Sequence, residues 1–162
     1  LAEDGDNGPL LNALDGEVGE ASSFAAQDDV TYADEPMHPG ASAVLALRAS
    51  PGQRLTVATM YGESNDVFAA VEPGGVPLFD EAGVPFEGDV SASLALWDAG
   101  TEVNQEPGVG ADQAPRQASA GAGDAEGGVV TRVDGTDSAG FSYPAANAML
   151  ALSIALQAPA EE

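Results

Sequence analysis

The apolar residues of this chain are concentrated in short alternating runs, and these runs constrain the fold more than any other feature. Residues 42–49 (SAVLALRA) and residues 54–61 (RLTVATMY) both place apolar side chains on alternate positions. Between them lies Ser50-Pro51-Gly52-Gln53, a turn sequence with proline at its favoured second position. Alternation on both sides of a turn predicts a β-hairpin.

Similar runs recur further along the chain and predict more strands. Turn-forming residues separate them, and the expected strands are residues 67–71, 90–97, 128–133 and 147–157. Residues 72–89 suit a loop or a loose pair of strands, and residues 103–127, rich in Gly and Ala, suit a long mobile loop. Near the start, Asn7 as N-cap and Pro9 in the first turn favour a short helix over residues 8–14.

Short strands, frequent turns and little helix together predict the fold class. We expect an all-β protein: one antiparallel β-sandwich domain over residues 1–162, with long Gly/Ala-rich loops and at most one short helix near the N-terminus. No internal repeat or domain boundary is visible in the sequence.

The charge balance restricts the partners of such a domain. The chain has 27 Asp and Glu against four Lys and Arg, a net charge of -23, and all four cations are arginine. Nucleic acids and anionic membrane surfaces require a basic face, so we expect neither as a partner. No run approaches the roughly 20 apolar residues of a membrane span. Cations are the natural partners of this surface.

The same composition suggests adaptation to high salt. Lysine is absent and 31 alanines replace bulkier apolar residues. At molar salt the Debye length falls to about 3 Å, which screens the self-repulsion of so acidic a chain. We therefore expect a halophilic protein that loses structure when salt is removed.

One acidic turn is the best candidate for a binding site. The segment LALWDAGTE ends an alternating run with Asp98 and Glu102 on a glycine-bearing turn. Carboxylates and backbone carbonyls gathered on such a turn suit a hard cation that takes only oxygen ligands, so calcium is the first candidate. The alternative is that two acids of an acidic chain simply lie in a solvated turn. Zinc is disfavoured because the chain has no cysteine and one histidine, His38.

The order of several motifs resembles the spondin N-terminal domain family. An apolar hairpin is followed by SNDVF, then LWDAGTE, a Gly-rich loop, a strand and YPAANAMLALSIAL, and the opening LAEDGDNGPLLNAL is similar to a segment of microbial members. The resemblance implies an extracellular β-sandwich with calcium at one end. Transferred to this chain, the calcium ligands would be Asp66 of SNDVF, Asp98 and Glu102.

The chain departs from that family in three ways. The second acid of the DAGTE turn is Glu102 where aspartate is usual, and Val67-Phe68 follow Asp66 in place of tryptophan. The strands that normally precede LAEDG are also missing, so the domain is expected to be incomplete at its N-terminus, either through truncation or because another chain supplies the strands.

Two functions from different classes follow. The first is a secreted calcium-binding module of the extracellular matrix or cell surface, with an adhesive or structural role and a matrix or surface protein as partner. The second is a protomer of an extracellular filament that assembles by strand exchange at an open sheet edge. We expect no enzyme, because nine aromatic residues spread along the chain do not build a sugar cleft around the paired carboxylates, and no pattern around His38 supports a catalytic triad.

Overall fold

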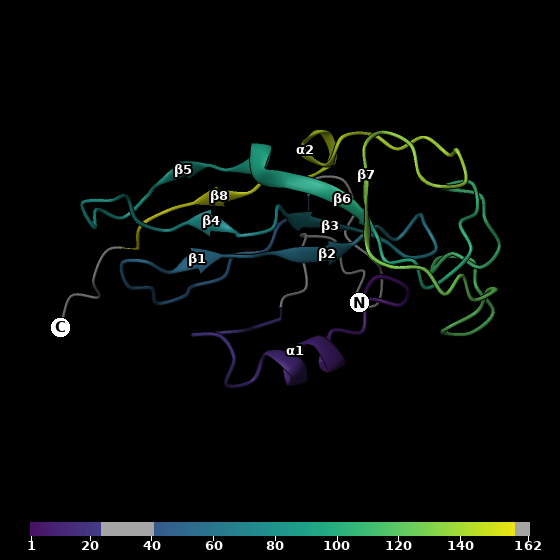
Figure 1. The fold of residues 1–162 in the computed structure, drawn as a ribbon, viewed down its shortest axis with the longest axis horizontal. Coiled ribbons are helices and arrows are strands. Elements are labelled where there is room, and N and C mark those ends of the chain that lie inside the picture. Colours follow the sequence, from purple (N-terminus) through teal and green to yellow (C-terminus); the bar gives the residue numbers. More distant parts are fainter. Residues whose placement is uncertain (24–40, 158–162) are drawn as a thin grey trace. The chain divides into compact units, whose positions relative to one another are not determined.

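The computed structural model describes residues 1–23 and 41–157 (Figure 1). The chain divides into two compact units, one formed by Leu1–Asp6 with Ala49–Glu162 and the other by Asn7–Arg48. The expectation of one domain over residues 1–162 stays a prediction.

A four-stranded antiparallel sheet forms the centre of the first unit. Its strands lie in the order β2 (Ala58–Met60), β3 (Val67–Val71), β6 (Leu94–Asp98) and β7 (Thr131–Val133). Figure 1 shows β3 and β6 side by side, and their register pairs Val67 with Asp98. The expected strand over residues 67–71 is confirmed, β6 overlaps the expected strand 90–97 and ends one residue later, and β7 lies within the expected strand 128–133.

Two smaller antiparallel ladders extend this arrangement. β1 (Arg54–Leu55) pairs with β4 (Val76–Pro77), and β5 (Gly88–Asp89) pairs with β8 (Ser153–Ile154). A short 3-10 helix, η1 (Ser91–Ser93), leads into β6. The described residues thus form an antiparallel β structure with few helices, in which much of the chain is loop.

The structure differs from the expected hairpin. The turn is present, since the Gln53 amide donates to the Ser50 carbonyl at 3.1 Å. However, β1 pairs with β4 and β2 pairs with β3, and residues 43–48 belong to no helix or strand. The physical reason is that the short corner at residues 61–66 brings β2 beside the buried strand β3 at a small loop-closure cost.

The last apolar segment also differs from expectation. Residues 146–149 form a helix, α2 (Ala146–Met149), and only Ser153–Ile154 of the expected strand 147–157 lies in a ladder. The expectation of at most one helix was therefore wrong. Alanine favours helix and Pro144 lies just outside its start, while Ala146 is buried in the core, so packing outweighs the period-two pattern. In the second unit, α1 (Gly8–Leu14) forms as expected, with Asn7 at the N-cap position and proline in its first turn.

Two apolar clusters hold the first unit together. One has Val67, Leu96 and Val133 at its centre and includes Tyr143. The rings of Tyr143 and Tyr61 pack edge to face, with their centroids 5.9 Å apart. The other is built from Val71, Val76 and Val90. Alternate residues of β3 and β6 supply both clusters, as the pleat of a strand requires.

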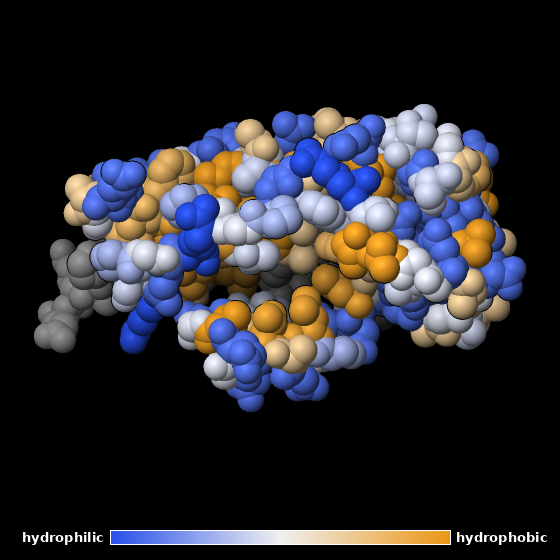
Figure 2. Space-filling model, viewed as in Figure 1, coloured by the Kyte–Doolittle hydropathy of each residue, from blue (hydrophilic) through white to orange (hydrophobic). Residues whose placement is uncertain are grey.

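The surface of the molecule is mixed in polarity. Figure 2 shows apolar side chains reaching the surface at several places between hydrophilic ones. Neither helix in the described part of the chain has the length and apolarity needed to cross a membrane.

Candidate metal centre

Asp66 and Asp98 lie at one end of the central sheet. Asp66 directly precedes β3 and Asp98 is the last residue of β6, and the pairing of Val67 with Asp98 places the two acids together. Both side chains are buried, with Asp66 0 % and Asp98 2 % exposed. Carboxylates are rarely buried without a partner, so the contacts of each oxygen matter.

The two oxygens of Asp66 differ sharply. Oδ2 accepts hydrogen bonds from the Thr101 amide at 2.6 Å, the Thr101 hydroxyl at 2.8 Å and the Glu102 amide at 3.0 Å. Oδ1 is buried and has no hydrogen-bond partner. Leaving a buried charged oxygen unpaired costs on the order of 1–3 kcal/mol or more. Oδ1 is therefore the atom that a cation would stabilise.

Asp98 is held in position by its own turn. Its Oδ1 accepts from the Gly100 amide at 2.7 Å, and its Oδ2 accepts from Asn104 Nδ2 at 2.6 Å. The Asn104 side chain is itself buried, and its Oδ1 has no partner. Asn104 Oδ1 is thus a second buried oxygen that lacks a hydrogen-bond donor, and it lies close to the acidic cluster.

A ladder of backbone hydrogen bonds brings a third acid to this end of the sheet. The Glu126 amide donates to the Thr101 carbonyl at 2.9 Å, and the Gly128 amide donates to the Gly100 carbonyl at 2.7 Å. Gly100 has φ +68°, and a Cβ there would lie 2.7 Å from the Val129 amide nitrogen. Only glycine permits both this conformation and this close approach.

The resulting cluster consists of Asp66, Asp98 and Glu126. One carboxylate oxygen from each lies within 4.8 Å of the other two, which is a spacing that can hold a metal ion. Glu126 is exposed, unlike the two aspartates, but partial desolvation raises its pKa, and the nearby Asp98, Asp66 and Asp137 carboxylates raise it further. The structure therefore concentrates negative charge where a cation would relieve it.

Glu102, the third predicted ligand, is not among the three carboxylates that converge. Its side chain is buried and its Oε2 accepts from Asn65 Nδ2 at 3.4 Å. Desolvation raises the pKa of Glu102, with contributions from Glu3, Asp66 and Asp4. Its own backbone amide, by contrast, binds Asp66. Coordination by the Glu102 carboxylate stays a prediction.

Sequence reasoning missed Glu126 and Asn104. Asn104 lies only six residues after Asp98, so an amide close to the DAGTE turn was a possible signal. Glu126 lies in a Gly-rich segment and gave no signal of its own. Its position depends on the pairing of residues 100–103 with residues 124–128, including the Glu102–Ala125 bridge.

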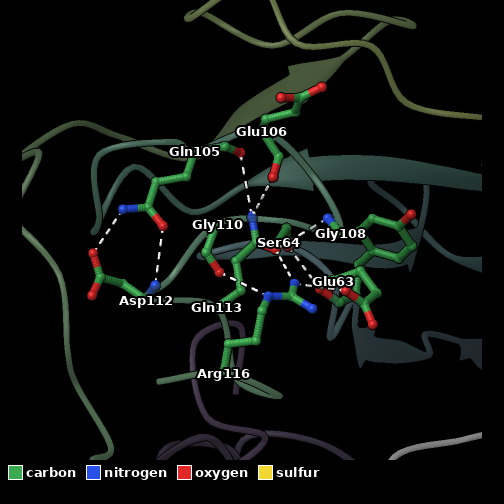
Figure 3. A network of polar contacts seen from close by, with 10 residues as sticks. Glu63, Ser64, Gln105, Glu106, Gly108, Gly110, Asp112, Gln113 and Arg116 are labelled. Carbon is green, nitrogen blue, oxygen red and sulfur yellow. Dashed lines mark hydrogen bonds and ion pairs between the residues drawn. The ribbon is translucent and has the colours of Figure 1, made fainter. Parts of the chain in front are cut away.

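The loop that precedes Glu126 has a polar interior. We expected residues 103–127 to form a long mobile loop, yet the Gln113 side chain within them is 0 % exposed. Figure 3 shows it among backbone groups: its Nε2 donates to the Glu106 carbonyl at 2.8 Å, and its Oε1 accepts from the Gly108 amide at 3.1 Å. Arg116 joins the loop to Glu63 through an ion pair at 2.7 Å.

His38 lies outside the described residues. Comparison of the chain with family models, with curated proteins and with solved structures gave no match.

Proposed function

We propose that this chain is a calcium-binding module in which Asp66, Asp98 and Glu126 hold the ion. The observation that carries the proposal is Asp66 Oδ1, a fully buried carboxylate oxygen without a hydrogen-bond donor, next to two further acids. Calcium takes six to eight oxygen ligands and accepts irregular geometry, so carboxylates together with an amide oxygen and water suit it. The Asn104 side chain offers such an amide oxygen.

The three carboxylates of the cluster repel one another. Two unit charges at the 4.8 Å limit of the cluster repel by about 3 kcal/mol at an effective dielectric constant of 20. The cluster contains three such pairs, and within the described part of the chain no arginine side chain forms an ion pair with these acids. A divalent cation would convert this repulsion into attraction.

The role of the ion in this proposal is structural. It would connect the corner before β3, the end of β6 and the loop that carries Glu126. A ligand that binds only the folded state stabilises it by mass action, by about 2.7 kcal/mol at a hundred times its dissociation constant. The ion would thus fix the loops at one end of the sheet.

The proposal also covers the family, the architecture and the location of the protein. The motif order supports membership of the spondin N-terminal domain family, a β-sandwich architecture and secretion to the matrix or cell surface, and the composition supports a high-salt environment. Other proteins or matrix components would then contact the loops that the ion fixes.

Isothermal titration of the metal-stripped protein with calcium in molar NaCl tests the site. We expect one strong site in the unchanged protein. Ligand loss should weaken binding at least as much as the roughly tenfold to hundredfold effect of outer-shell changes, so Asp98→Asn and Glu126→Gln should each weaken it at least about tenfold.

Two matched variants make the result specific. Glu81→Gln removes the same charge from an exposed turn and should leave the affinity unchanged. Glu102→Gln tests the ligand inferred from the family resemblance: a loss equal to that of Glu126→Gln would add Glu102 to the shell. If Asp98→Asn and Glu126→Gln bind calcium as tightly as the unchanged protein does, the site is wrong.

A further inference from the structure

The acids of this chain are unevenly distributed, and two long stretches have none: residues 36–62 and residues 138–160. The chain averages one Asp or Glu in six residues, from 27 acids in 162 positions, yet residues 36–62 contain no acid and include Arg48 and Arg54. The chain as a whole is strongly acidic. A stretch without acids on such a protein is therefore a candidate for a surface that is covered by a partner.

The described part of this stretch presents large apolar side chains to solvent. Every residue from 42 to 48 is exposed, with Val44 at 95 % and Leu45 and Leu47 at 44 % each. The backbone of residues 43–48 lies in no helix or strand, although the sequence alternates as a strand does. One end is fixed within its own unit, since the Arg48 amide donates to Glu20 Oε2 at 3.3 Å.

Among residues 1–23 and 41–157, the other exposed large apolar side chains either have acids close by in sequence or are single, as is Leu156, 56 % exposed, in residues 138–160. Val109, for example, is 65 % exposed, but Glu106 and Asp112 lie three residues to either side of it. The acid nearest in sequence to Val44 on the N-terminal side is Glu35, and on the C-terminal side it is Glu63. Among the described residues, only residues 42–48 combine an acid-free sequence with three large exposed apolar side chains within a few positions.

We propose that residues 42–48 form an antiparallel pair with the same residues of a second copy of this chain. The sequence is complementary to itself in one register, centred on Leu45. In that register Leu45 meets Leu45 of the second copy, Val44 meets Ala46, and Ala43 meets Leu47. Each large side chain beside the axis thus faces a small one, and antiparallel pairing supplies the backbone hydrogen bonds.

Charge explains why a second copy is a suitable occupant in high salt. Two chains of net charge -23 repel each other strongly, and the acid-free stretch lets them approach with the fewest carboxylates at the contact. Molar salt screens the remaining repulsion. A two-fold axis uses the same patch on both copies, so the assembly closes at a dimer and does not grow into a filament. This pairing is independent of the metal centre.

Sedimentation equilibrium of the full chain in molar NaCl tests the proposal. We expect a reversible monomer–dimer equilibrium. Val44→Glu places a buried charge on each side of the axis and should raise the dimer dissociation constant by at least about tenfold. Val109→Glu is the matched control, because it adds the same charge at another exposed valine, and it should leave the dimer unchanged.

A second measurement does not depend on the folding of the Val44→Glu variant. The chain has no cysteine, so Leu45→Cys introduces a single thiol on the axis, where Cα atoms about 4.5–5.5 Å apart fall in the range a disulfide can bridge. Mild oxidation should convert Leu45→Cys to a covalent dimer at least about tenfold faster than Val109→Cys.

Three results would overturn the proposal. The first is a monomer at every concentration, as when another part of the same chain covers the segment. The second is a dimer that Val44→Glu leaves intact, and the third is equal cross-linking of Leu45→Cys and Val109→Cys. Open-ended polymers would likewise exclude a closed two-fold pair.

Discussion

The Gly128 amide donates a 2.7 Å hydrogen bond to the Gly100 carbonyl, and this contact joins the end of β6 to the segment that carries Glu126. The two backbones approach so closely that the Gly100 Cα lies 3.2 Å from where a Gly128 Cβ would be. The glycine of the DAGTE turn therefore does more than turn the chain: it allows a distant acid to reach Asp66 and Asp98.

We expect Gly100→Ala to lower the free energy of unfolding by about 2–4 kcal/mol, because alanine is strained at φ +68° and its Cβ would lie 2.7 Å from the Val129 amide nitrogen. Gly135→Ala is the control, since Gly135 has φ +82° but nothing within 4 Å of a Cβ. Denaturant unfolding in molar salt measures both. Equal losses would mean that the close approach to Val129 contributes nothing.

The raised pKa of Glu126 predicts a pH dependence that calcium reverses. A carboxyl whose folded pKa lies above its unfolded value stabilises the fold fully below the unfolded pKa, and this stability is lost as pH rises through the folded pKa. Metal-stripped protein should therefore melt at a higher temperature as pH falls from 7 to about 5. With excess calcium the trend should invert, because the ion requires the deprotonated carboxylate.

Thermal melts of the unchanged protein and of Glu126→Gln, with chelator and with calcium, separate this effect from the general relief of acid repulsion. The difference between the two proteins should change with pH. If it stays constant across the range, Glu126 does not titrate in the way its surroundings indicate.

Gln113 offers a test of how the loop is held. Gln113→Ala would leave the Glu106 carbonyl without its side-chain donor in a buried site, while the Gly108 amide would keep its bond to the Glu63 carbonyl at 2.9 Å, so we expect a cost of about 1–3 kcal/mol in the free energy of unfolding. Gln117→Ala, which removes only the side-chain bond to Asp4, should cost less than about 1 kcal/mol. Chemical denaturation of both variants in the same buffer makes the comparison, and similar small losses would show that the Gln113 contacts do not organise the loop.

Salt should control the fold as a whole. With a net charge of -23, we expect the circular dichroism spectrum to lose its strand signal on dialysis from molar to millimolar NaCl, because self-repulsion is no longer screened. Added calcium should delay the loss. A spectrum unchanged between the two salt concentrations would contradict adaptation to high salt.

Local patterns predicted local elements well. The helix at residues 8–14 followed from its N-cap and proline, and strand 67–71 followed from a continuous apolar run. Pairing was harder to predict, because residues 54–60 could satisfy their backbone groups with several partners. The choice of β3 and β4 over residues 42–49 depended on burial and loop closure, which alternation alone does not encode.

The same limit applies to the candidate site. Asp66 and Asp98 could be chosen because each adjoins a strand whose position was predictable. Glu126 could not be chosen in this way. Its position beside Asp66 and Asp98 depends on the close approach of two glycines from segments nearly thirty residues apart in the sequence. Glu102 was chosen from its spacing in the motif, but in the structure its carboxylate lies beside Asn65.

The buried amide of Gln113 has a consequence for life in concentrated brine. Its bonds to the Glu106 carbonyl and the Gly108 amide join uncharged groups, unlike the bond that the Arg116 guanidinium donates to its Oε1, so mobile ions have no net charge to neutralise in those two bonds. An ion pair such as Arg116–Glu63 weakens as salt increases, whereas these contacts do not. A chain with four arginines and no lysine can thus keep a long glycine-rich loop in shape at salt concentrations where cationic side chains contribute little.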